Sequence, residues 1–532
     1  MALKRAPEHI NPDEVGGIID MAKPVGEVIY RFHCKLVTPM YGGGVDAGEV
    51  DAAMPMRATA IRGQLRFWWR LITRNQYLEN GRLNSKKQFE AERIIWGGLG
   101  DEETLTASKV TLRLTPIKSS EVEECCAYPK ESDGSFKTFP KWKTWASGYA
   151  LFPAQGKASR SGVTEQPKKL LLPGYEWELV LSMHGMDDAA VATVVSAIKW
   201  WASFGGVGAR TRRGLGAVEV VQLQPNRILM RVGIGEINLQ SGVELRLREA
   251  VISDKDTAVD AMKAGIDALQ KFRQGKDFGR NSASSASKSP VGRSRWPEPD
   301  AIRRITGTHY PNHAPEHVAG NIFPRAAFGL PIIFHFKDKN EPVESELLPV
   351  KNNMDMTRMA SPIILHSYRS ADGHWQAAAL RLPDSHVWKM TVKLKGKNNN
   401  LSYVMPDGKW WIDGKGKLIK PMQKSPHDNP LQAFLDFFGN SPVLSTEPEQ
   451  VVVDLTPAEQ VVWENVRIKF NRQNGTLSAE HKNKQAYAMG DDVFRLMANL
   501  STTKQKDIKG GGFVKLNITV NGREIVKLEE CK

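Results

Sequence analysis

The stretch Phe204-Gly-Gly-Val-Gly-Ala-Arg-Thr-Arg-Arg-Gly-Leu-Gly216, here called the glycine loop, combines glycines with arginines. Its spacing is Gly206-x-Gly208-x5-Gly214-x-Gly216, and its cations are Arg210, Arg212 and Arg213. Glycine tolerates positive φ and lets a backbone approach a ligand closely. Exposed backbone N–H groups favour anions, and arginines add fork-shaped donors for phosphate. The pattern predicts polyanion binding; the alternative is a tight turn with solvated arginines.

The flanks of the glycine loop argue against a nucleotide fold. A helix-like run over residues 187–203 precedes the loop, and a β-like run over 217–223 follows it. A dinucleotide fingerprint has the strand first, so the order here is reversed. No Gly-Lys-Ser/Thr follows the glycines, which argues against a P-loop.

A second group of arginines lies on a helix expected over residues 60–77. Its apolar face holds Leu65, Trp68, Trp69 and Ile72. The arginines recur every four residues and form one drifting stripe, with no acidic i,i+4 partner between its ends. The stripe, together with the preceding Arg57, is a candidate RNA-binding surface, and a solvated helix face is the alternative. The members of the stripe are Arg62, Arg66, Arg70 and Arg74.

Further short motifs occur in a fixed order along the chain. They are Leu-Val-Thr-Pro at 36–39, Gly-Gly-Gly at 42–44, Ile-Arg-Gly-Gln-Leu-Arg-Phe-Trp-Trp-Arg at 61–70, Glu-x-x-Ile-Trp-Gly at 92–97, Trp-Pro-Glu-Pro-Asp-Ala-Ile-Arg at 296–303, Phe-Pro-Arg-Ala-Ala-Phe-Gly-Leu-Pro at 323–331 and Arg-Met-Ala-Ser-Pro at 358–362. With the glycine loop, they resemble the RAMP superfamily of RNA-binding CRISPR proteins, and within it the first subunit of the type III-B (Cmr) effector complex. The resemblance covers roughly residues 28–400 and is weaker towards the end.

The resemblance and the periodicities predict an α+β fold. We expect tandem ferredoxin-like (RRM-like, RAMP) domains with insertions and a small C-terminal β-containing extension. The predicted parts are an N-terminal extension (1–27), a first RAMP domain (28–225) with an insertion (118–169), a second RAMP-like lobe (226–425) with a flexible basic segment (274–295), and a C-terminal extension (426–532). Asn-Gly at 521–522 predicts a terminal hairpin.

The resemblance implies a non-catalytic RNA-binding subunit of an antiviral ribonucleoprotein. Such a subunit would help to hold the 3′ region of the CRISPR guide RNA and capture target RNA beside the other Cmr subunits, without a cofactor or a metal. Basic residues around the second-lobe motifs predict another side of an RNA or partner channel. These candidates are Arg293, Arg295, Trp296, Arg325 and Arg358.

Composition is consistent with an acidic partner. The chain of 532 residues carries a formal net charge of +14, which does not choose between RNA, DNA and anionic lipid. Its four cysteines form no C-x-x-C or disulfide framework, as expected of a reducing compartment. Neither a signal peptide nor a membrane-spanning stretch is recognisable, so we expect a cytoplasmic protein without a membrane partner.

Other function classes stay open. An endoribonuclease would use His33 on the first strand, or the loop aspartates Asp46 and Asp51 with a metal. A DNA-binding architectural protein would show no preference for RNA. The i,i+4,i+8 histidines at 309, 313 and 317 are interrupted by prolines, so a histidine-bearing loop is preferred over a zinc site.

Overall fold

The computed structural model separates into two compact units, Met1–Glu449 and Gln450–Lys532. It describes residues 26–46, 48–51, 54–99, 105–248, 257–282, 291–336, 338–395, 400–401, 419–422, 429–440, 461–471, 476–482, 484–489, 493, 496–497, 500–510, 513–521 and 524–531. The mixture of helices and strands confirms the predicted α+β class. Among the described residues, none of the helices combines the length and the apolar character that crossing a lipid bilayer requires.

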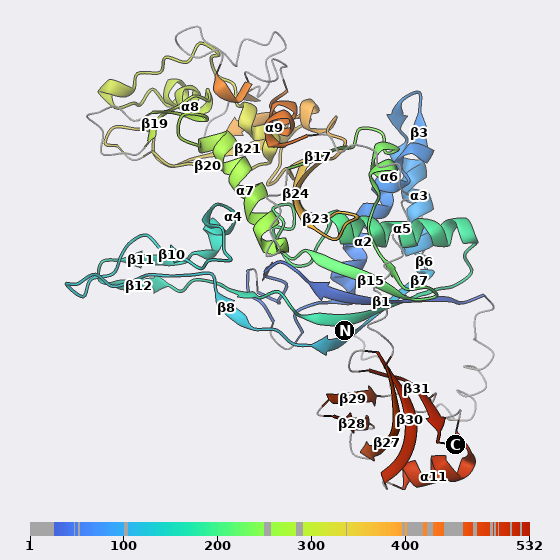
Figure 1. Cartoon of the computed structure of the whole chain (residues 1–532). Coiled ribbons are helices and arrows are strands. Elements are labelled where there is room, and N and C mark those ends of the chain that lie inside the picture. The colour runs from blue at the N-terminus through green and yellow to red at the C-terminus, as the bar shows by residue number, and fades with distance from the viewer. Residues whose placement is uncertain are drawn as a thin grey trace, which may run out of the picture. The chain divides into compact units, whose positions relative to one another are not determined.

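The first lobe is built on a five-stranded antiparallel sheet with the order β16-β15-β1-β14-β7 (Figure 1). Its strands are β1 (Val28–Leu36), β7 (Val110–Lys118), β14 (Glu176–Met183), β15 (Val218–Gln224) and β16 (Ile228–Leu229). Helix α2 (Ala58–Ile72) follows β1, and α5 (Asp188–Phe204) follows β14. Along the chain, the main elements therefore run β1-α2-β7-β14-α5-β15.

Period-2 burial on β1 defines the two faces of this sheet. Phe32, Cys34 and Leu36 are fully buried, whereas His33 between them is half-buried on the other face. Leu65 and Trp68 of α2 join the same core as these strand residues. Helices α2 and α5 pack on each other and lie on one face of the sheet (Figure 1). The predicted helix over 60–77 ends early: α2 stops at Ile72, and Arg74–Tyr77 forms a 3-10 turn, η1.

Helix α3 (Ser85–Trp96) lies between α2 and β7 in the chain. The predicted insertion after β7 contains short strands and a helical turn. Its elements are β8 (Val122–Glu124), β9 (Cys126–Ala127), β10 (Lys141–Trp142), α4 (Gly148–Leu151), η3 (Phe152–Ala154), β11 (Lys157–Ser159), β12 (Gly162–Glu165) and β13 (Lys169–Leu171). Strand β13 pairs with β8 and with β2 (Met40–Tyr41), which ties the insertion to the loop after β1.

The second lobe has its own core. Strands β17 (Glu244–Leu247), β24 (Trp375–Arg381) and β23 (Ile363–Arg369) form an antiparallel sheet in that order. Helix α7 (Ala258–Gln274) packs on β23 and β24, and α9 (Pro430–Phe438) packs on α7. Phe272 of α7 has its ring centroid 5.3 Å from that of Phe434 in α9. Thus α9, which follows the predicted domain boundary at 425/426, belongs to this core.

The remaining elements of this lobe flank that core. They are α6 (Ile234–Asn238), β18 (Arg280–Ser282), β19 (Val291–Ser294), α8 (Glu298–Thr306), η4 (Pro311–His313), η5 (Pro324–Phe328), β20 (Ile332–Phe334), β21 (Ser345–Lys351), β22 (Met354–Asp355), η6 (Val387–Lys389), β25 (Thr391–Leu394), β26 (Asn400–Leu401) and η8 (Lys420–Met422). The described flanks of the basic segment 274–295 pair as β18 and β19, and residues 283–290 lie outside the described residues.

The C-terminal unit contains a closed barrel of strands in the order β27-β28-β29-β31-β30. These strands are β27 (Val461–Asn471), β28 (Thr476–His481), β29 (Lys484–Met489), β30 (Phe513–Asn521) and β31 (Glu524–Glu530), with α11 (Thr502–Lys509) before β30. Strands β30 and β31 pair antiparallel, as the terminal-hairpin prediction requires. Barrel closure removes the unpaired strand edges that would otherwise invite aggregation.

The glycine loop joins α5 to β15 through close backbone packing. Gly216 has a φ of +69°, and a Cβ there would lie 1.9 Å from the carbonyl oxygen of Val207. The Val207 N–H donates to the Gly216 oxygen at 2.9 Å, so this contact is part of a backbone pair. A side chain at Gly216 would break the loop apart.

We therefore expect Gly216→Ala to lower the free energy of unfolding by about 2 kcal/mol or more, through unfavourable φ and the clash with Val207. Gly63→Ala in α2 is the matched control, because a Cβ there meets nothing within 4 Å. It should stabilise by about 0.5–1 kcal/mol, since alanine favours a helix. Denaturant unfolding of both variants tests this; equal effects would contradict it.

Candidate nucleic-acid interface

The arginines of the glycine loop are held by main-chain carbonyls of neighbouring elements. Arg210 has a φ of +60° and donates from Nη1 to the Ala150 oxygen of α4 at 2.8 Å. Arg212 donates to the Ser361 oxygen before β23. Arg213 donates to the Phe328 oxygen of η5 at 3.4 Å. Such acceptors orient guanidinium groups without neutralising them.

Two further arginines belong to this group. Arg273 of α7 donates to the Tyr149 hydroxyl at 3.0 Å, and its guanidinium lies 5.9 Å from the Phe328 ring centroid. Arg358, which is exposed, lies close enough to Arg210 for their charges to repel. We call Arg210, Arg212, Arg213, Arg273 and Arg358 the arginine cluster. Among the described residues, no carboxylate forms a salt bridge with any of them.

Within the arginine cluster, Arg212 and Arg213 carry their positive charge where it is poorly hydrated. Burial lowers the pKa of Arg213 to about 10. Tyr149 raises this pKa in part, whereas repulsion from Arg273, Arg210 and Arg212 lowers it further. Burial likewise lowers the pKa of Arg212. Both groups stay protonated at neutral pH. Repulsion without internal counter-ions is relieved by an anionic ligand, because an opposite charge favours the charged form.

The glycines contribute differently from the sequence prediction. Gly206, Gly214 and Gly216 are buried, and added Cβ atoms would meet protein backbone or a core methionine rather than open space. Gly208 is exposed with a φ of +77°, but its Cβ would lie 2.6 Å from the Tyr41 oxygen. The prediction that glycines open the backbone to a ligand is therefore corrected: they let the loop pack on its own chain.

The backbone N–H groups of the loop confirm this correction. Those of Val207, Ala209, Arg213, Gly214 and Gly216 all donate to main-chain oxygens, with distances between 2.7 and 3.0 Å. The Ala209 N–H, for example, donates to the Tyr41 oxygen of β2. These five donors are therefore unavailable to an anion.

The arginine stripe of α2 is only partly free. Glu92 of α3 has a 2% exposed side chain, and its Oε1 accepts from Arg66 Nε at 2.6 Å and from Arg70 Nη1 at 2.7 Å. Arg62 donates to the Trp96 oxygen. Burial, followed by repulsion from Arg66, lowers the pKa of Arg62. The stripe has no acidic i,i+4 partner on α2 itself, but Glu92 of another helix supplies a counter-ion for Arg66 and Arg70.

Arg57 and Arg74 flank this paired portion. Arg57 is the N-cap residue of α2, and Arg74 begins the 3-10 turn after it. Both side chains are half-buried, and neither makes a hydrogen bond or ion pair with the part of the chain that the structure describes. These two remain candidates for an external anion.

Most second-lobe candidates are engaged within the lobe. Arg293 pairs with Asp300 at 2.8 Å, and buried Arg325 pairs with fully buried Glu298 at 2.9 Å. Arg295 donates to the Asn281 side chain at 2.9 Å, and Trp296 is only 1% exposed in the core. Arg325 and Trp296 are thus buried within the lobe, whereas Arg293 and Arg295 keep partly exposed side chains beside their internal partners. Arg358 alone of the five belongs to the arginine cluster.

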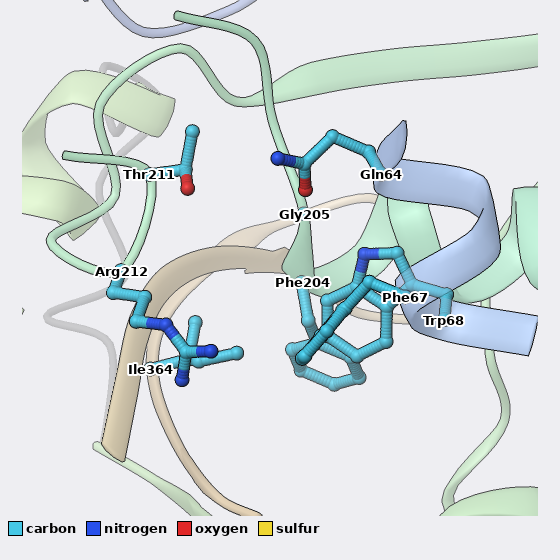
Figure 2. Close-up of a pocket in the computed structure, with 8 residues that line it drawn as sticks. All are labelled: Gln64, Phe67, Trp68, Phe204, Gly205, Thr211, Arg212 and Ile364. Atoms are coloured by element: carbon cyan, nitrogen blue, oxygen red, sulfur yellow. The ribbon is translucent and has the colours of Figure 1, made fainter. Parts of the chain in front are cut away.

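A pocket of about 160 Å³ adjoins the arginine cluster (Figure 2). Figure 2 shows Thr211 and Arg212 of the glycine loop on one side and side chains of α2 on the other. The Arg212 guanidinium lies 5.4 Å from the Phe67 ring centroid. The lining residues are Gln64, Phe67, Trp68, Phe204, Gly205, Thr211, Arg212 and Ile364.

The alternative catalytic residues lie elsewhere. His33 Nε2 is 3.0 Å from Glu176 Oε2 on the sheet face opposite the core. The main-chain oxygen of Asp46 accepts from the Glu49 N–H at 3.1 Å. The carboxylate oxygen Oδ1 of Asp51 accepts from the Met54 N–H at 3.0 Å. Across the described ranges, none of His33, Asp46 and Asp51 joins a group of three metal-ligating side chains.

Of the three spaced histidines, His313 does join such a group, with Asp338 and Glu341. Its Nδ1 lies 2.5 Å from Glu341 Oε1, but Arg303 Nε also pairs with Glu341 at 2.9 Å. The guanidinium already neutralises this buried carboxylate, so the group is an ion-pair network.

The comparison with family models gives the same superfamily as the sequence motifs. Residues 33–219 match the RAMP superfamily model. The match runs from β1 to β15, so it includes α2, α5 and the glycine loop. This finding confirms the resemblance at the level of the RAMP superfamily. None of the curated proteins matches the chain.

Solved structures similar to this chain include components of CRISPR complexes. Cmr1 from Pyrococcus furiosus in its apo form has 14% sequence identity and a TM-score of 0.35, with 67% of this chain and 88% of that chain covered. A chain of the type III-B Cmr-beta complex bound to cognate target RNA and AMPPnP, in the presence of ssDNA, has 10% identity and a TM-score of 0.30, with coverages of 78% and 99%. Cmr6 from Pyrococcus furiosus has 13% identity, a TM-score of 0.19, and coverages of 36% and 98%.

Sequence reasoning missed three elements of this interface. Arg273 and Tyr149 come from the second lobe and the insertion, and no local pattern connects them to the glycine loop. For Glu92 the sequence held a usable signal, because the apolar Ile95 and Trp96 follow it at the i+3 and i+4 positions of a helix face. No sequence pattern could have indicated the pocket, because its walls come from separate elements.

The Glu92 pair predicts that Arg66→Ala with Arg70→Ala destabilises the fold, because buried Glu92 loses both partners. Removing one side of a fully buried pair costs about 3–5 kcal/mol. Arg66 and Arg70 are 30% and 44% exposed, so about 1–3 kcal/mol is expected here after allowing for solvent screening. The matched control, Arg57→Ala with Arg74→Ala, should stay within about 0.5 kcal/mol. Denaturant unfolding measures both; an unaffected Arg66/Arg70 variant would show that Glu92 needs neither arginine.

Proposed function

We propose that this protein is a non-catalytic RNA-binding subunit of a type III-B CRISPR ribonucleoprotein. It would help to hold the guide RNA 3′ region and to capture target RNA for antiviral defence in the cytoplasm, beside other Cmr subunits. The observation that carries RNA binding is the arginine cluster, whose five cations have no carboxylate partner among the described residues. The sequence motifs and the superfamily match support the CRISPR context.

The tandem RAMP architecture belongs to this proposal. In the first lobe, the sheet order β15-β1-β14-β7 with α2 and α5 on one face is that of a ferredoxin-like βαββαβ unit. In the second lobe, β17, α7, β23 and β24 follow the chain order of a βαββ unit, with β24 central in the sheet. The two units would support the arginine cluster from both sides.

The glycine loop connects these lobes directly. The Leu365 N–H of β23 donates to the Arg212 oxygen at 3.1 Å, and the Arg212 side chain donates to the Ser361 oxygen. Buried His366 Nε2 lies 2.7 Å from the Gly205 oxygen, and burial lowers the pKa of His366 to about 4. A neutral imidazole therefore lies at the junction at physiological pH. A strand crossing this junction would meet cations from both lobes.

Guanidinium groups without base-specific surroundings favour phosphate contacts, so binding should be largely independent of sequence. In such a complex, base pairing between guide and target would supply sequence choice. The protein would contribute charge and position.

The first functional prediction concerns salt dependence. Arg210→Ala with Arg358→Ala removes two exposed cations from the arginine cluster. For single-stranded RNA, each lost phosphate contact should reduce the slope of log affinity against log salt by about 0.7, so the slope should flatten by about 1.4. Fluorescence anisotropy with unrelated RNA oligonucleotides at several salt concentrations measures this.

Arg82→Ala with Arg113→Ala is the matched control for charge. Both residues are exposed, and neither has a carboxylate partner in the described part of the first lobe. This variant carries the same net charge as Arg210→Ala with Arg358→Ala. Equal slopes for the two double variants would mean that overall charge, rather than the arginine cluster, determines binding.

The second functional prediction is that the purified protein leaves single-stranded RNA intact in Mg²⁺ or Mn²⁺. The described residues bring no metal-ligand group around His33, Asp46 or Asp51, although His33 has Glu176 as a neighbour. Gel analysis of end-labelled RNA over several hours tests this. Cleavage lost in His33→Ala, or in Asp46→Ala with Asp51→Ala, would instead establish the endoribonuclease alternative.

A further inference from the structure

The pocket beside the arginine cluster has the size of one aromatic ring. Its volume of about 160 Å³ is close to that of an apolar cavity of ~150 Å³ that accommodates benzene. Phe67, Phe204 and Ile364 give it apolar walls (Figure 2). One six-membered ring therefore fits within this volume.

Trp68, which lines this pocket, carries a buried polar group without a partner. Trp68 is 1% exposed, and its indole Nε1 has no hydrogen-bond partner in the structure. The neighbouring Gly205 brings its Cα close to that nitrogen, since a Cβ at Gly205 would lie 2.8 Å from it. A buried donor left unpaired costs free energy, which a ligand acceptor would recover.

Other polar groups of the pocket are also available. The side chains of Gln64 and Thr211 are half-buried and form no hydrogen bond within the described parts of the chain. Arg212 uses Nη1 on the Ser361 oxygen, and its guanidinium packs near Phe67. Two of the lining side chains, Trp68 and Arg212, can only donate hydrogen bonds. The matching ligand is a flat single ring that carries carbonyl acceptors on its edge.

We propose that this pocket takes one unstacked pyrimidine base of an RNA strand whose phosphates lie on the arginine cluster. A pyrimidine has one ring and an O2 acceptor, and uracil adds a second carbonyl at O4. Arg212 belongs to both the pocket and the cluster, so the base and its phosphate would bind at adjoining places. This inference rests on the proposed RNA binding and adds a base preference to it.

The test compares oligouridylate, oligocytidylate and oligoadenylate of equal length, with the full-length protein. The key variant is Trp68→Phe, which keeps one aromatic ring in the core but removes the N–H donor together with the second ring of the indole. Trp177→Phe is its control, because Trp177 Nε1 is another buried indole N–H without a partner but lies on β14, away from the pocket lining. Thermal unfolding of both variants shows whether the core is intact.

We expect oligouridylate to bind more tightly than oligoadenylate, with oligocytidylate between them. Loss of one hydrogen bond should weaken oligouridylate binding by Trp68→Phe roughly three- to tenfold, with oligoadenylate affinity and the salt slope unchanged. Phe67→Ala should reduce pyrimidine affinity by about fivefold or more through lost stacking. Trp177→Phe should bind as the unmodified chain does.

The outcomes separate the two proposals. Base stacking alone produces modest preferences among bases. A preference for uridylate therefore supports the pocket only if it depends on Trp68. Salt-dependent binding without an effect of Trp68→Phe and Phe67→Ala would overturn the base pocket and leave the arginine cluster as a phosphate site. Absence of RNA binding would overturn both. Trp68→Phe cannot be interpreted if it lowers the unfolding midpoint more than Trp177→Phe does. In that case Gln64→Ala, at a half-buried lining residue, replaces it. Unchanged affinity of Gln64→Ala for oligouridylate would then overturn the pocket.

Discussion

The close backbone pairing between Val207 and Gly216 is the constraint on which the rest of this interface depends. A Cβ at Gly216 would fall 1.9 Å from the Val207 oxygen, so the two ends of the loop approach as no other residue would permit. This pairing closes the loop at its base. Arg210, Arg212 and Arg213 all lie between the two paired residues. Their common location follows from packing rather than from any contact among the arginines, which repel one another.

The same loop explains how two lobes form one site. Strand β23 of the second lobe meets the glycine loop through the Leu365 N–H and the Ser361 oxygen, and His366 reaches Gly205. Burial keeps this histidine neutral by lowering its pKa to about 4, so the junction gains no further positive charge at neutral pH. The charge at the junction comes from arginines that remain protonated. An arrangement of this kind is suited to a ligand with several negative charges in a row.

Outside the insertion, local periodicity was sufficient to predict the main helices and strands of the first lobe but not their tertiary contacts. Alternation on β1 and the apolar face of α2 follow from residues close in sequence, and the structure confirms both. The partner of Arg66 and Arg70 is Glu92, on a different helix, so i,i+4 spacing could not reveal it. Likewise, Arg325 and Glu298 are separated by a loop and become partners only when the second lobe folds. The arginine-rich motifs therefore located the cations, but they did not show which cations a carboxylate already neutralises.

Arginines paired with carboxylates and arginines without them have different roles in this protein. Arg325 is buried against a carboxylate, so its charge is compensated and contributes to the fold. Arg213 is held by carbonyl oxygens, and its depressed pKa reports the cost of keeping the charge there. Groups arranged to be unfavourable in the free protein gain most when a ligand supplies the missing charge. Binding a polyanion would then stabilise the folded chain by mass action, because the unfolded chain does not hold these arginines together. The electrostatic strain of the cluster and the affinity that we propose for a phosphate chain thus have the same physical origin.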